Sequence, residues 1–126
     1  MQRTGIWALP RHVQEDIARR TCPYTVETIL DPGHVGLNVY LPGGVVYLRI
    51  PPGSSKKLKA FSSRVRKNEE SRWRRGSIDT FDVHFPNLTL RYEDGLVFIY
   101  ITKMISAVIF ACPSLMDRLD ELAKHL

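Results

Sequence analysis

Asp82 with His84, and Asp31 with His34, are the only histidine–acid pairs in predicted strand or turn positions where general acid–base chemistry could be arranged. A metal-independent ribonuclease would need an acid, a base and a cation over the phosphate. His84, Tyr92 and Arg91 can be assigned to these three roles. The sequence contains no catalytic motif, so we expect a protein without catalytic residues and keep the ribonuclease only as an alternative.

Metal and cofactor chemistry also lacks a sequence signal. The four histidines are scattered, and two distant cysteines cannot form a structural zinc site alone. No pair has the spacing of a C-x-x-C or H-E-x-x-H motif. The glycines of Pro42-Gly43-Gly44 belong to a predicted hairpin turn and not to the strand-to-helix turn of a phosphate loop. We therefore predict no metal and no cofactor.

Charge is the feature that the sequence concentrates in one place. Residues 54–75 hold nine of the eighteen lysines and arginines against two glutamates, a net charge of +7, whereas the remaining residues carry nine bases and eleven acids, a net charge of −2. A cationic surface for a polyanion is therefore predicted here. The ten candidate binding residues are Lys56, Lys57, Lys59, Arg64, Arg66, Lys67, Arg72, Trp73, Arg74 and Arg75.

Most of this segment has the pattern of a helix that packs along one narrow edge. Leu58, Phe61 and Val65 share a stripe at helical spacing, and the cations occupy the rest of the circumference. Two serines after Pro-Pro-Gly can cap the start. We expect the helix to run from about residue 55 to about residue 70, leaving residues 71–75 as a basic loop.

Aromatic residues are candidates for stacking on unpaired bases. Trp73, between arginines, could stack on a nucleobase or cover the core. Strand aromatics could form a further platform on one sheet face, with Tyr40 and Tyr100 as the better exposed ones. The whole strand set is Tyr40, Tyr47, Phe81, Phe98 and Tyr100.

The remaining chain alternates between short strands and turns. Pro10 to Arg20 is predicted as a short helix, and Leu115, Leu119 and Leu122 repeat at helical spacing in a last helix, preceded by a Ser114–Asp117 capping box. The predicted strands cover residues 24–30, 34–41, 45–50, 78–85, 88–92, 96–102 and 105–111.

The most apolar tract, residues 96–112, does not have the pattern of a membrane span. It is shorter than the roughly 20 residues that a span needs, and Lys103 in its middle would cost about 2.5–3.5 kcal/mol. Two buried strands joined at Thr102-Lys103 fit better. No apolar run follows a basic head at the N-terminus, so we expect an intracellular protein of the cytoplasm or nucleus.

We predict a single α+β domain over residues 1–126: a short N-terminal helix, then two antiparallel strand-rich units, β-β-β-α and β-β-β-β-α. Residues 37–50 and 88–101 align without a gap, which suggests an internal repeat of residues 24–75 and 77–126. This layout resembles that of Whirly-type and PUR-type single-strand nucleic-acid binders. The resemblance implies two antiparallel sheets backed by helices.

The charge distribution leaves three functions open. Largely sequence-independent binding of single-stranded RNA or DNA is the first, because clustered cations displace counterions from phosphates. A peripheral membrane or matrix-like protein could set the same helix against anionic lipid. A protein-interaction adaptor could use it for an acidic partner. Homo-oligomers are compatible with each function.

Overall fold

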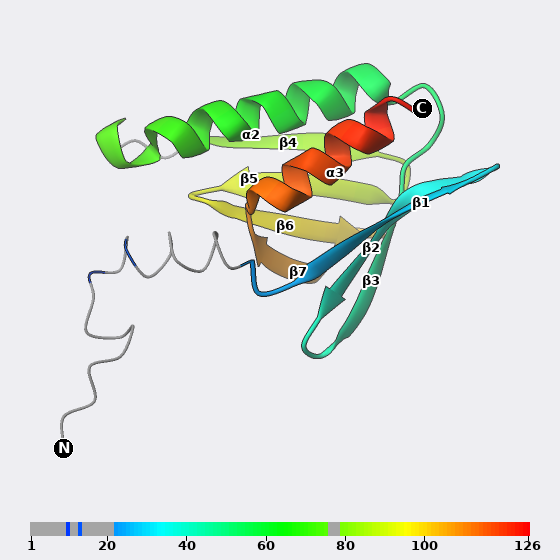
Figure 1. The fold of residues 1–126 in the computed structure, drawn as a ribbon, viewed down its shortest axis with the longest axis horizontal. Helices are drawn as coiled ribbons and strands as arrows, with labels where there is room; N and C mark the ends of the chain where they lie inside the picture. Colours follow the sequence, from blue (N-terminus) through cyan, green and yellow to red (C-terminus); the bar gives the residue numbers. More distant parts are fainter. Residues whose placement is uncertain (1–9, 11–12, 14–21, 76–78) are drawn as a thin grey trace.

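The computed structural model describes residues 10, 13, 22–75 and 79–126, with residues 72–75 described as helical backbone. These residues form two antiparallel sheets, of three and four strands, each followed by a helix (Figure 1). The predicted α+β order of elements is therefore confirmed. Apart from Pro10 and Val13, the expected helix over residues 10–20 lies outside the described residues.

The first sheet is a meander of three strands. Its elements are β1 (Thr25–Asp31), β2 (His34–Leu41) and β3 (Gly44–Arg49), paired in the order β1-β2-β3. Two-residue turns connect them, and the first ends on Gly33 with φ of 79°, a conformation that favours glycine. After β3 the chain enters the long helix α2 (Ser55–Arg75).

The second sheet is a meander of four strands that leads into the last helix. Its elements are β4 (Thr80–Phe85), β5 (Leu88–Glu93), β6 (Leu96–Ile101), β7 (Met104–Phe110) and α3 (Pro113–Ala123). The Asp94-Gly95 turn has positive φ at both residues, as expected for a tight hairpin. The apolar tract of residues 96–112 contains strands β6 and β7, joined at Thr102-Lys103 as predicted. No helix within the described ranges is long and apolar enough to cross a membrane.

Both helices lie over one face of the second sheet (Figure 1). α2 packs on α3 and on the edge strand β4, and α3 also packs on β1 and β2. The predicted stripe of Leu58, Phe61 and Val65 is buried, with at most 4% of each residue exposed. Phe61 meets the ring of Phe81 edge-on, at 5.6 Å between centroids. The apolar side of α2 is therefore part of the core, and its remaining surface is polar.

Tyr24 ties the start of the first sheet to the end of the second. Its hydroxyl donates a hydrogen bond to the backbone carbonyl of Phe110 and accepts one from the backbone N–H of Cys112 at 3.4 Å. Only 6% of Tyr24 is exposed. Burial, followed by the interaction with Cys112, raises the pKa of this phenol well above its usual range.

Two helix boundaries differ from the predictions. α2 continues to Arg75 and does not end near Glu70, so residues 71–75 are helical and the predicted basic loop is wrong. α3 begins after Cys112, which makes no side-chain capping bond, and Pro113 fills the first turn. The Ser114–Asp117 capping box is therefore not formed, because Cys112 occupies the N-cap position and Ser114 lies inside the first turn of the helix.

The two hairpins proposed as a repeat place equivalent residues on equivalent faces but pair them differently. Val39 lies opposite Val46 in the first hairpin. In the second, Leu90 lies opposite Ile99 and not opposite Val97, because the turn comes one residue later in the alignment. An internal repeat stays a prediction.

Candidate nucleic-acid interface

The six cations of α2 between residues 56 and 67, whose side chains the structure describes, fall into three groups according to what each contacts. The first, which we call the lysine ridge, consists of Lys56, Lys59 and Lys67. All three residues are exposed, and among the described residues no hydrogen bond or ion pair engages their ammonium groups. Their positions lie on the side of the helix opposite the buried stripe. The ridge is therefore a set of solvated charges that a polyanion can reach.

The second group faces β4. Lys57 Nζ donates a hydrogen bond of 2.8 Å to the backbone carbonyl of His84. The guanidinium of Arg64 lies 4.2 Å from the centroid of the Phe81 ring, an arrangement typical of a cation–π contact, and 4.0 Å from a carboxylate oxygen of Asp79. More than half of the Arg64 side chain is exposed. Lys57 and Arg64 are therefore exposed enough to contact a ligand, although each already has a partner within the protein.

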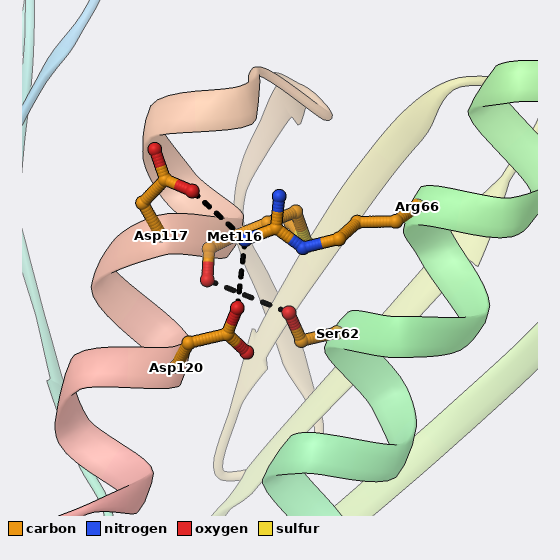
Figure 2. A network of polar contacts seen from close by, with 5 residues as sticks. All are labelled: Ser62, Arg66, Met116, Asp117 and Asp120. Carbon is orange, nitrogen blue, oxygen red and sulfur yellow. Dashed lines mark hydrogen bonds and ion pairs between the residues drawn. The ribbon is translucent and has the colours of Figure 1, made fainter.

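Arg66 forms the third group alone, since it joins the two helices. Its guanidinium donates to Asp117 at 2.8 Å and to Asp120 at 2.7 Å, both on α3 (Figure 2). The hydrogen bond with Asp117 is the largest cause that raises the pKa of Arg66. Beside this bridge, the Ser62 hydroxyl donates to the backbone carbonyl of Met116 at 3.4 Å. Two carboxylates thus neutralise Arg66, which contributes to helix packing and not to an open cationic surface.

The C-terminal end of the segment extends the charged helix. Arg72, Trp73, Arg74 and Arg75 belong to α2 by backbone, so the helix has 21 residues and a length of about 30 Å. Glu69, one of the two acids in the segment, accepts a hydrogen bond from the hydroxyl of Tyr92 on the sheet below. The helical backbone of the segment therefore carries basic residues over several turns, and one of its acids is hydrogen-bonded to the sheet.

The strand aromatics do not share a surface with the ridge. Phe81 is in the core between Phe61 and Tyr92, so its predicted role in a stacking platform is excluded. Phe98 and Tyr100 point from the second sheet to the face away from α2. The remaining two, Tyr40 and Tyr47, are about 40% exposed on the outer face of the first sheet.

The residues assigned to a ribonuclease do not converge. Tyr92 is 1% exposed on the inner face of the second sheet and stacks on Phe81. His84 and Arg91 lie on the outer face, where Arg91 donates to Asp82 at 2.9 Å. One face of a strand cannot supply all three groups, because Arg91 and Tyr92 are consecutive and alternate between faces.

Sequence reasoning missed Asp117 and Asp120 as the partners that remove Arg66 from the cationic surface. Their three-residue spacing on a predicted helix was the one available signal, because such residues share a helix face. Which cation they would meet depends on how α2 and α3 cross, and the pattern of either helix alone does not determine that.

No protein-family model, no curated protein and no solved structure matches this chain. The resemblance to Whirly-type and PUR-type proteins therefore remains one of element order.

Proposed function

We propose that this protein binds single-stranded nucleic acid, RNA or DNA, largely without regard to sequence, through the cations of α2. The observation that carries the proposal is the lysine ridge: three exposed lysines without described partners, on a helix that continues into Arg72, Arg74 and Arg75. Cations that carry no internal salt bridge can neutralise phosphates and release counterions at little structural cost. Trp73 supports the choice of single strands, because an aromatic ring beside arginines can stack on an unpaired base.

The burial of the apolar stripe argues against a membrane-inserting helix. A helix that lies in a bilayer interface must place an apolar face among the acyl chains. In α2 that face is Leu58, Phe61 and Val65, which are packed in the core. The exposed side of α2 could therefore attract a lipid surface only through its cations, and these cations can bind the phosphates of a nucleic acid equally well.

A binding titration at two salt concentrations tests the proposal. Fluorescein-labelled single-stranded oligonucleotides and vesicles containing phosphatidylserine are the two ligands. We expect oligonucleotide binding at 0.05 M salt that weakens steeply at 0.2 M, and weaker binding to vesicles. Vesicle binding without oligonucleotide binding would contradict the proposal and support the membrane alternative.

A further inference from the structure

β4 leaves one strand edge unpaired within the described sheet. The strand order β4-β5-β6-β7 puts it at the border. The carbonyl of His84 accepts a hydrogen bond from Lys57, so this carbonyl points away from β5 and toward α2. Backbone groups alternate in direction along an antiparallel strand, and those of Asp82 and Thr80 therefore point the same way. These groups form a template for another strand.

α2 runs along β4 (Figure 1), and a groove lies between this strand edge and the helix. Its volume is about 330 Å³. Phe61, Phe81 and Val83 form an apolar floor and are each less than 10% exposed. The helix side carries Lys57, Ala60 and Arg64, which follow one row at three- and four-residue spacing. The small side chain of Ala60 leaves room between the two cations.

The geometry points to addition of an extended acidic peptide from a protein partner, paired along the free edge of β4 beneath Lys57 and Arg64. Peptide N–H groups would replace Lys57 as the donor to the His84 carbonyl, and the released ammonium would bind a carboxylate of the peptide. A peptide fits better than a nucleic acid, because the exposed groups of β4 recur every two residues, about 6.6 Å, as they do in a partner strand.

The side chains of an added strand would alternate between two different surroundings, so the preferred residue type should alternate along the peptide. Side chains of the added strand that point toward α2 meet Lys57 and Arg64 and should be aspartate or glutamate. Those that point to the outer face lie beside Asp82, whose carboxylate is held there by Arg91 at 2.9 Å. Like charges on adjacent strands are unfavourable. Acidic residues are therefore expected at every second position and not in a continuous run.

Selection from a display library of random octapeptides on the immobilised full chain tests this inference. We expect enriched peptides with alternating acidic residues. The groove variant Lys57→Gln/Arg64→Gln should bind them at least tenfold more weakly, and the ridge variant Lys56→Gln/Lys67→Gln should bind them as the parent does. No enrichment, or acidic residues without alternation, would overturn the inference.

Backbone pairing is tested separately. His84→Pro removes an N–H that points away from β5, so pairing with β5 is retained and peptide binding should be lost. If that variant does not fold, N-methylation of the selected peptide at each position in turn gives the same information on the parent protein. Loss of binding at every second methylated position is expected. Equal losses of binding for methylation at every position would contradict strand addition. A Lys57→Gln/Arg64→Gln variant that loses oligonucleotide binding but keeps peptide binding would contradict it as well.

Discussion

Arg66 and Lys67 are consecutive cations whose surroundings differ. Arg66 is held between Asp117 and Asp120, whereas the ammonium of Lys67 has no partner among the described residues. The same formal charge therefore contributes to packing at one position and to an open surface at the next. Sequence composition counts both alike, and this is why the predicted list of binding residues includes a structural one.

Replacing each of these two residues by glutamine should give opposite results. Arg66→Gln should lower the free energy of unfolding by about 1 kcal/mol, since the ion pairs are partly exposed, with oligonucleotide affinity nearly unchanged. Lys67→Gln should leave stability unchanged and weaken binding about fivefold at 0.1 M salt, the expected loss for one phosphate contact on a single strand. Urea unfolding and fluorescence anisotropy measure the two quantities. Equal effects of both variants on binding would show that Arg66 is not sequestered.

Tyr24 predicts an alkaline limit to stability. Its folded pKa is raised, while the unfolded phenol ionises near pH 10. The contribution is complete below pH 10 and is lost as pH rises, because the unfolded state then releases a proton that the folded state retains. We expect a loss of about 1 kcal/mol at pH 11 compared with pH 9 that is absent in Tyr24→Phe. Urea unfolding of both proteins at the two pH values provides the test, and an identical pH dependence would contradict it.

At the scale of elements, the positions of strands and helices follow closely from the sequence. Each of the seven predicted strands is present, because alternating apolar residues and turn signals such as Asp94-Gly95 are local properties. The end of α2 was not predictable from the same signals. We expected the helix to end at about residue 70, yet the backbone stays helical to Arg75.

The two hairpins should respond differently to the same truncation. Val97 is 1% exposed, whereas Val46 is only partly buried at the aligned position. We expect Val97→Ala to cost on the order of 2 kcal/mol and Val46→Ala about 1 kcal/mol or less. Urea unfolding measures both. A greater cost at Val46 would contradict the packing described for the two sheets.

At the scale of the whole molecule, the fold class was predictable and the arrangement of charges only in part. The buried stripe of α2 followed from helical periodicity, so the sequence correctly indicated that the cations lie on the other sides. Which of them would remain open depended on contacts between distant elements, with β4 engaging Lys57 and α3 engaging Arg66. The groove along β4 has no sequence signal, because it arises from the packing of α2 beside a strand edge.

The central claim is that the lysine ridge binds the phosphates of a single strand. The most direct test is the salt dependence of oligonucleotide affinity for Lys56→Glu/Lys67→Glu, compared with Arg49→Glu/Lys103→Glu. The second pair lies on strand β3 and on the β6–β7 turn, and it changes the net charge equally. The ridge variant should reduce the slope of log K against log salt by about 1.4, or two phosphate contacts, and the control variant should leave the slope unchanged. Equal slopes for the two variants, with both proteins folded, would contradict the claim.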